Sequence, residues 1–339
     1  MGEGDLVWPR LLDDFRSGCM RKFYRSPGSL DPARIPIPRR DLLNKKRYSI
    51  LNTVQATRGC PFSCKFCTTR TVYPVFQTRP VENVIKEIER VEGGPLQRRV
   101  IMFWDDNLVG NPLWAESLFR EMIPLKKIWF GQCTFNMVRD KALVRLAAKS
   151  GCRGLFFGLE SFNAISLRNN GKSHNDVRIY EDGIRFLHDC GISVYTGIMF
   201  GFDDDREDIS EITYEQLNRL GVDVVAPRIV VPYPNTSLFQ KLVHENRIIH
   251  RNWSKYDGSH AVFRPRQMTA AELEKGFRWF DREFHSTRSI ATRLWKSRTF
   301  PWLSLPVNLS KHRWIEKAYA ELHPSGHPYP IRAAFTEDF

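Results

Sequence analysis

The chain has 339 residues, of which 42% are hydrophobic, so it can bury a sizeable core in one large domain with additions. Its formal net charge is +13 at pH 7, but the basic residues are not gathered in one tract. No RRM, KH or helix-turn-helix signature is present, which makes a nucleic-acid partner an unfavoured prediction. Seven cysteines are too few for a small secreted disulfide scaffold. No signal peptide and no apolar run of about 18 residues is found, which favours the cytoplasm.

The sequence divides into three parts. Residues 1–45 are rich in Pro, Arg and Asp and weakly periodic, which predicts a lead-in or linker. Residues 46–245 alternate between strand-like runs and amphipathic helical stripes. Strands are expected at 49–57, 100–104, 128–135, 154–159, 192–200 and 222–231. This alternation is typical of a parallel α/β sheet. Six units fall short of the eight of a closed barrel, so we expect a partial (β/α)6 TIM-like barrel, with a flat doubly wound sheet as the alternative.

The third part, residues 246–339, is expected to be a helical, basic and aromatic extension. A helix is predicted over 269–297, and Pro301 and Pro306 are expected to prevent one continuous helix beyond it. Its cations and large aromatics are Arg288, Arg293, Lys296, Arg298, Lys311 and Arg313 with Trp295, Phe300, Trp302 and Trp314. One interpretation is peripheral contact with the inner face of a membrane or with a lipid-like substrate. The slightly favoured alternative is that the aromatics pack back onto the barrel.

Three of the seven cysteines, Cys60, Cys64 and Cys67, lie together directly after the first expected strand. Parallel α/β sheets bind their ligands at that edge. Three thiolates within eight residues can surround one metal centre, and a [4Fe-4S] cluster held by three of them keeps one iron open for another ligand. Zinc is the main rival, although a structural zinc site needs a fourth Cys or His and the next histidine is His174. Three unrelated buried cysteines are the remaining alternative.

The cysteine spacing, with the aromatic Phe66 before the last cysteine, resembles the signature of radical S-adenosylmethionine (SAM) enzymes. The segments 57–67, 104–107, 158–161 and 232–238 resemble those of the cobalamin-binding branch, which includes hopanoid methylases and the anaerobic magnesium-protoporphyrin cyclase. The similarity covers about residues 1–300. Two departures stand out: Asn235 occupies a position where the family usually has glycine, and the chain lacks the cobalamin-binding domain that members usually carry before the barrel. Residues 1–5 resemble the end of that domain.

This resemblance implies a [4Fe-4S] cluster on Cys60, Cys64 and Cys67, with SAM on the open iron through its amino and carboxylate groups. An electron from the cluster then cleaves a C–S bond of SAM and gives a 5′-deoxyadenosyl radical. The residues that it implies for SAM binding are Phe66, Asp105, Gln132, Glu160, Gly197, Ile198 and Pro232. An electron donor such as flavodoxin or ferredoxin is also implied. Cobalamin is expected only if a missing or separate domain supplies it.

Three of these residues keep an alternative interpretation. Asp105 either faces the SAM amino group or the substrate, or lies in a solvated turn. Gln132 either faces the barrel interior or, as is slightly favoured, points outward. Glu160 either accepts hydrogen bonds from the ribose hydroxyls or the SAM amino group, or is a solvated loop residue; the first is favoured. No catalytic acid or hydrogen-atom donor is assigned.

The predicted function is therefore reductive cleavage of SAM that drives methylation or radical rearrangement of an apolar or polycyclic small molecule. Two alternatives remain. The chain could be a truncated or degenerate cluster-binding protein without turnover, or a transfer-RNA-modifying radical SAM enzyme, as its positive charge would suggest.

Overall fold

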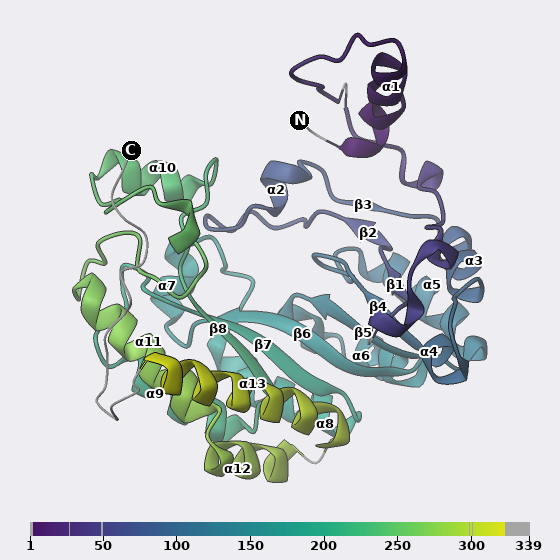
Figure 1. The fold of residues 1–339 in the computed structure, drawn as a ribbon. Coiled ribbons are helices and arrows are strands. Elements are labelled where there is room, and N and C mark those ends of the chain that lie inside the picture. The colour runs from purple at the N-terminus through teal and green to yellow at the C-terminus, as the bar shows by residue number, and fades with distance from the viewer. Residues whose placement is uncertain (1–2, 27, 49, 298, 300, 323–339) are drawn as a thin grey trace.

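The computed structural model describes residues 3–322 except 27, 49, 298 and 300, and omits the side chains of 301–303 and 318–322. Its centre is a parallel sheet of six strands (Figure 1). In spatial order they are β1 (Thr53–Val54), β4 (Val100–Phe103), β5 (Ile128–Cys133), β6 (Cys152–Glu160), β7 (Ser193–Phe200) and β8 (Val224–Ile229). Because spatial order follows chain order, the sheet has no switch point, which excludes the doubly wound alternative. In the described residues β1 and β8 do not pair, so the barrel is open and the (β/α)6 prediction is confirmed.

Helices cover one face of this sheet (Figure 1). The helices of this layer are α3 (Val81–Glu89), α5 (Pro112–Met122), α6 (Lys141–Lys149), α8 (Tyr180–Asp189) and α9 (Ile209–Leu220). The other helices are α1 (Gly4–Arg16), α2 (Thr69–Val72), α4 (Pro95–Arg99), α7 (Ala164–Asn169), α10 (Ser237–His244), α11 (Ala270–Phe284), α12 (Thr287–Ser297) and α13 (Pro301–Leu322). A hairpin of β2 (Thr57–Arg58) and β3 (Gln77–Thr78) flanks the cysteine segment.

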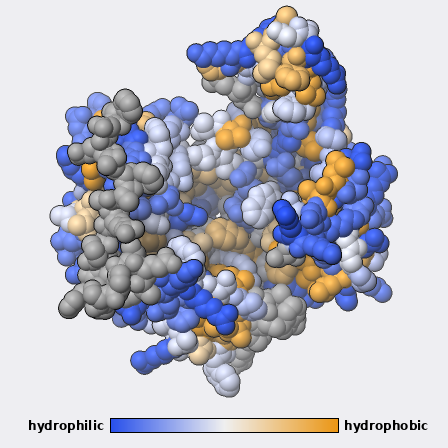
Figure 2. Space-filling view, in the orientation of Figure 1, coloured by the Kyte–Doolittle hydropathy of each residue, from blue (hydrophilic) through white to orange (hydrophobic). Residues whose placement is uncertain are grey.

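The two faces of the sheet carry different side chains because residues alternate along a strand. On the helix side, Trp129 stacks on Phe119 of α5 with ring centroids 5.1 Å apart, which fills the core. On the other side, Gln132, Phe156 and Tyr195 pair in register across β5, β6 and β7 and are exposed or half-buried. The space-filling view shows a hollow over the middle of the sheet on this side (Figure 2). The open face is therefore the one that can receive a ligand.

Several elements differ from the sequence-based expectations. The lead-in contains a helix, α1, none of whose residues is buried. The first expected strand, 49–57, is reduced to β1 and the start of the hairpin. The helix predicted over 269–297 is two helices that meet at residues 285–286. The expectation that proline would interrupt the last helix is wrong, because α13 runs through Pro306. Tertiary contact outweighs the lost backbone donor there: Asn308 donates from Nδ2 to the Asp223 carbonyl oxygen, 2.8 Å away.

Arg293 of α12 ties the C-terminal helices to the sheet. Its guanidinium is fully buried and donates to the carbonyl oxygens of Val222, Asp223 and Phe284 at 2.8–3.0 Å. It also lies 3.7 Å from the centroid of the Phe284 ring. The interpretation of Arg293 as a surface cation for lipid headgroups is therefore wrong. Arg298, Phe300 and the side chain of Trp302 lie outside the described residues. Among the helices described, none is long and apolar enough to cross a membrane.

We predict that Arg293→Met lowers the free energy of unfolding by at least about 3 kcal/mol, since each buried acceptor left without a donor costs about 1–3 kcal/mol. The matched control is Arg288→Met, an exposed position on the same helix, which should change it by less than about 0.5 kcal/mol. Urea denaturation of the two variants measures the difference. Equal stabilities would contradict the assignment of Arg293 as the anchor of α12.

Candidate cluster and SAM site

The three clustered cysteines lie in the loop between β2 and α2, at the carboxyl edge of the sheet. Gly59 begins this loop with a φ of +81°, and a Cβ there would lie 3.0 Å from the Val75 carbonyl oxygen. Glycine is therefore required for the turn that directs the chain into Cys60. The Cys67 amide then donates to the Cys64 carbonyl oxygen at 3.1 Å, which closes a tight turn. All three cysteines have free, partly buried side chains.

Two distant segments hold this cysteine loop in place. The Lys65 amide donates to the Asn170 carbonyl oxygen at 2.9 Å, and the Leu238 amide donates to the Lys65 carbonyl oxygen at 2.9 Å. The rings of Phe62 and His174 stack with centroids 3.7 Å apart. The connection after β6 and the first turn of α10 therefore define the shape of the loop together.

Nitrogen donors point at two of the sulfur atoms. Asn107 is fully buried, and its Nδ2 donates to Cys60 Sγ at 3.8 Å. Its Oδ1 accepts from the Thr134 amide at 3.3 Å, which orients the side chain. The Thr69 amide donates to Cys67 Sγ at 3.5 Å. Donors directed at sulfur favour thiolates, the form in which cysteine binds metal.

Glu160 at the end of β6 forms a buried ion pair with Lys172, with 2.8 Å between Oε1 and Nζ. Its φ is +66°, a strained value for a residue other than glycine. Gly158 makes room for the pair, because a Cβ there would overlap the Glu160 carboxylate. Burial raises the pKa of the Cys64 thiol to about 11, and the nearby Lys172 ammonium acts in the opposite direction. The Lys172 Nζ also lies 5.9 Å from the centroid of the Phe66 ring.

Asp105 does not lie in the solvated turn that one interpretation expected, and its contact with SAM stays a prediction. It is buried, and its Oδ1 accepts from the amides of Ala56 and Thr57 and from Thr57 Oγ1. Its Oδ2 is buried without a hydrogen-bond partner among the described residues. Burial raises the pKa of Asp105 to about 7, although the hydrogen bonds from Thr57 and Ala56 oppose this. The carboxyl group therefore supports the chain three residues before Cys60 and does not lie in a solvated turn.

The other SAM candidates lie along the same edge of the sheet. Gln132 is exposed on the open face, and its Nε2 donates to the Asp106 carbonyl oxygen at 3.3 Å. The interior-facing alternative, the less favoured one, thus describes its position. Gly197 is buried beside Glu160, with its Cβ position 3.7 Å from Oε2. Ile198 is buried in the core, and Pro232 is buried just beyond β8.

Phe66 is buried against Phe202, with ring centroids 5.8 Å apart.

The backbone conformation of Asn235 explains why asparagine can replace the glycine that the family usually has there. Its φ is +66°, a conformation that asparagine adopts more readily than most residues other than glycine. The residue that replaces glycine therefore keeps the same turn before α10.

The chemistry of the donor set fits a [4Fe-4S] cluster. The three cysteines of the loop have free, partly buried side chains, and two of their sulfur atoms accept hydrogen bonds, which favours the thiolate form. Cys60, Cys64 and Cys67 could therefore hold three irons of a cubane.

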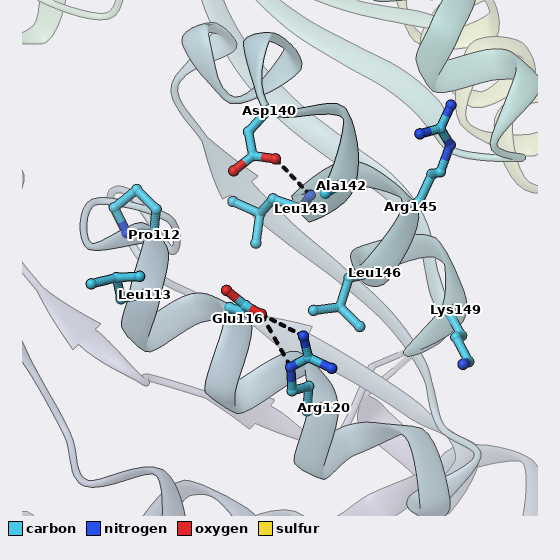
Figure 3. A pocket seen from close by; sticks show the side chains of 10 residues that line it. All are labelled: Pro112, Leu113, Glu116, Arg120, Asp140, Ala142, Leu143, Arg145, Leu146 and Lys149. Atoms are coloured by element: carbon cyan, nitrogen blue, oxygen red, sulfur yellow. Dashed lines mark hydrogen bonds and ion pairs between the residues drawn. The ribbon is translucent and has the colours of Figure 1, made fainter.

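A separate pocket of about 330 Å³ lies between α5 and α6 on the helix side (Figure 3). Its polar groups are engaged locally: Arg120 Nε donates to Glu116 Oε1 at 3.1 Å, and Asp140 Oδ1 accepts from the Leu143 amide at 2.9 Å. Its lining includes neither the cysteine loop nor Glu160. The pocket is therefore distinct from the site at the strand ends.

Two residues of the site were missed in the sequence. Asn107 belongs to a segment that resembles the family, but no pattern indicated that its amide would reach Cys60. Lys172 follows Glu160 by twelve residues, a separation for which no local rule predicts contact. The unusual run Asn169-Asn170-Gly171 before Lys172 is the one available signal, since such residues favour tight turns.

Comparisons with known proteins agree with this geometry. The sequence pattern of the Radical SAM superfamily matches residues 54–213. Bacteriochlorophyllide d C-12(1)-methyltransferase of Chlorobaculum tepidum is 29% identical over 329 residues, which cover 95% of this chain and 71% of the relative. Hopanoid C-2 methylase of Rhodopseudomonas palustris is 27% identical over 256 residues, which cover 73% of this chain but only 48% of that protein.

The fold is also similar to a solved structure. The cobalamin-dependent SAM radical enzyme OxsB, with aqua-cobalamin and SAM bound, superposes with a TM-score of 0.60 at 15% identity. The match covers 96% of this chain and 57% of OxsB. The domain at residues 54–213 implies a [4Fe-4S] cluster and SAM as cofactors. Residues 54–213 of the chain therefore match the Radical SAM superfamily, and the relatives and the fold agree with this match.

Proposed function

We propose that this chain is the core of a radical SAM methyltransferase that acts on an apolar polycyclic small molecule, with its cluster on Cys60, Cys64 and Cys67. The observation that carries the proposal is the convergence of the cysteine loop, the buried Asn107 amide and the Glu160–Lys172 pair at one edge of the sheet. The choice of methyl transfer over radical rearrangement follows from the two relatives named above, both of which carry methylating activities in their names.

A row of small residues supports the place proposed for SAM. Gly158, Gly197 and Ala226 pair in register across β6, β7 and β8. The Glu160 side chain fills the space over Gly158 and lies 3.7 Å from the Cβ position of Gly197, so a ligand can approach the row most closely at the exposed Ala226. Glu160 lies at the end of this row, where its carboxylate could accept hydrogen bonds from SAM. Gln132 and Phe156 lie one register row away on the same face and are candidates to contact substrate.

The roles proposed for the protein are to bind, orient and shield. When bound, the cluster supplies the electron that cleaves a carbon–sulfur bond of SAM. Phe66 and Phe202 exclude water from the inner side of the loop. Asp105 holds the turn that precedes the cysteines. A low-potential donor such as flavodoxin or ferredoxin would reduce the cluster. Cobalamin, which OxsB binds, enters the proposal only as a cofactor that another domain or protein would supply.

Anaerobic reconstitution should give about four irons and four sulfides per chain, as expected for one cubane. Replacing Cys60, Cys64 and Cys67 together with Ala should remove the iron and its visible absorption. The control is Cys19→Ala with Cys190→Ala, two cysteines outside the loop, which should keep both. A wild-type chain that takes up a single zinc, or a triple variant that keeps its iron, would contradict the proposal.

Glu160→Gln should weaken SAM binding to the reconstituted protein by about 1–3 kcal/mol, the usual loss when a buried polar contact is removed. Equilibrium dialysis with labelled SAM measures the affinity. Glu116→Gln, which changes a partly buried acid on α5 outside the site, is the control and should bind SAM normally. If Glu160→Gln lowers the melting temperature but leaves SAM affinity unchanged, Glu160 acts only through its pair with Lys172.

We further propose that the C-terminal helices touch an anionic membrane surface. Trp295 on α12 and Trp314 on α13 are 87% and 61% exposed, and Lys311 Nζ lies 4.5 Å from the centroid of the Trp314 ring. Indole rings favour the membrane interface, and cations near it attract anionic headgroups. Trp295 and Trp314 are therefore exposed aromatic side chains on C-terminal helices that Arg293 ties to the sheet.

The chain should therefore sediment with phosphatidylserine liposomes at low salt, and replacing Trp295 and Trp314 together with Ala should reduce the bound fraction. Trp253→Ala is the matched control, because Trp253 is 56% exposed but lies outside these helices. Absence of sedimentation at low salt, or equal loss in the control, would rule out this surface.

A further inference from the structure

A buried amide and a buried ammonium approach the cysteine loop from two different connections. Asn107 comes from the segment after β4, and Lys172 from the segment after β6. Both side chains are more than nine-tenths buried. Neither forms part of the proposed ligand set of the cluster. Their shared position beside the sulfur atoms therefore needs another explanation.

The amide of Asn107 has a defined orientation. Its Oδ1 accepts from the Thr134 amide, and its Nδ2 donates to Thr134 Oγ1, both at 3.3 Å. If the side-chain amide were turned over, its oxygen would lie against Cys60 Sγ, and the lone pairs of the two atoms would repel each other. The hydrogen bonds therefore direct an N–H of Asn107 at the Cys60 sulfur, 3.8 Å away.

Lys172 lies beside the cysteine loop. Its Nζ is 5.9 Å from the centroid of the ring of Phe66, which lies between Cys64 and Cys67 in the chain. A Cβ on Gly171, the residue before Lys172, would lie 3.6 Å from the Cα of Cys64, and the Asn170 carbonyl oxygen accepts from the Lys65 amide. The positive end of the ion pair is therefore held next to the cysteine loop.

We propose that Asn107 and Lys172 together stabilise the reduced state of the cluster and raise its reduction potential. Uptake of one electron from an external low-potential donor adds one negative charge to the cluster and its thiolates. A hydrogen bond to a ligand sulfur and a nearby cation both favour that added charge, and both are known determinants of cluster potential. Asn107 and Lys172 are positioning residues in this account. The inference rests on the proposed function, because it requires the cluster on the three cysteines.

The test is a redox titration of the anaerobically reconstituted chain, followed by electron paramagnetic resonance without SAM or substrate. Asn107→Ala removes the donor. Asn107→Asp keeps the volume but places an acceptor against Cys60. Replacing Lys172 with Met and Glu160 with Gln together removes the ion pair without leaving an unpaired buried charge. The control is Asn52→Ala. Asn52 is equally buried, but its side chain donates to the carbonyl oxygens of Glu92 and Gln97 and not to the cysteine loop.

The midpoint potential should become more negative in all three site variants, most of all in Asn107→Asp, by more than the scatter between replicate wild-type titrations. The Asn52→Ala midpoint should match wild type even if that variant is less stable. Full iron content with wild-type midpoints in the Asn107 and ion-pair variants would overturn this inference and leave the proposed function intact. A wild-type chain that assembles no [4Fe-4S] cluster would overturn both.

Discussion

The buried ion pair between Glu160 and Lys172 is the constraint on which the geometry of the site depends. Burying two opposite charges costs free energy unless they form a close ion pair. The distance of 2.8 Å between Glu160 Oε1 and Lys172 Nζ is short enough for such a pair. The pair requires a left-handed backbone at Glu160 and glycine at position 158. It also draws the connection after β6 over the cysteine loop, where Asn170 bonds to Lys65. Strain at the end of one strand is thus coupled to the shape of a loop about a hundred residues earlier.

The parallel sheet explains why such contacts can form at all. All six strands run in chain order, so their carboxyl ends meet at one edge. On one face of the sheet, large buried side chains such as Trp129 and Phe157 pack against the helix layer. The other keeps small or half-exposed residues, including Gly197 and Tyr195. Helix α12 is held at the opposite end of the sheet, because Arg293 donates to the carbonyl oxygens of Val222 and Asp223 just before β8.

The sequence predicts those features that depend on local periodicity. The strand–helix alternation and the cysteine spacing are both visible within windows of a few residues. The order of the strands had two alternatives, a partial barrel and a doubly wound sheet, and the structure distinguishes them. The hairpin of β2 and β3 was missed because strands of two residues show no period. Helix α1 was missed because none of its residues is buried and its hydrophobic side chains do not mark a core face. The last helix was underestimated because proline rules describe the isolated helix and omit its tertiary anchors.

Prediction of the site from the sequence had the same limit, because its contacts are not local. The resemblance to the family is enough to suggest Glu160 and Gln132, but not what each of them contacts. The contact of Lys172 with Glu160 and of Asn107 with Cys60 depends on the path of connections that no pattern encodes. The resemblance also suggested Asp105 for SAM binding, but not that its Oδ1 accepts from the backbone of residues 56 and 57. Distinguishing these roles requires the three-dimensional arrangement.

The central claim is that three cysteines hold a cubane whose remaining iron is open to SAM. Mössbauer spectroscopy of the chain reconstituted with ⁵⁷Fe, recorded with and without SAM, tests it most directly. The account predicts a cubane spectrum in which one iron site changes on addition of SAM while the other three, held by Cys60, Cys64 and Cys67, stay as they were. A spectrum of a mononuclear site, or a cubane in which no iron responds to SAM, would contradict it.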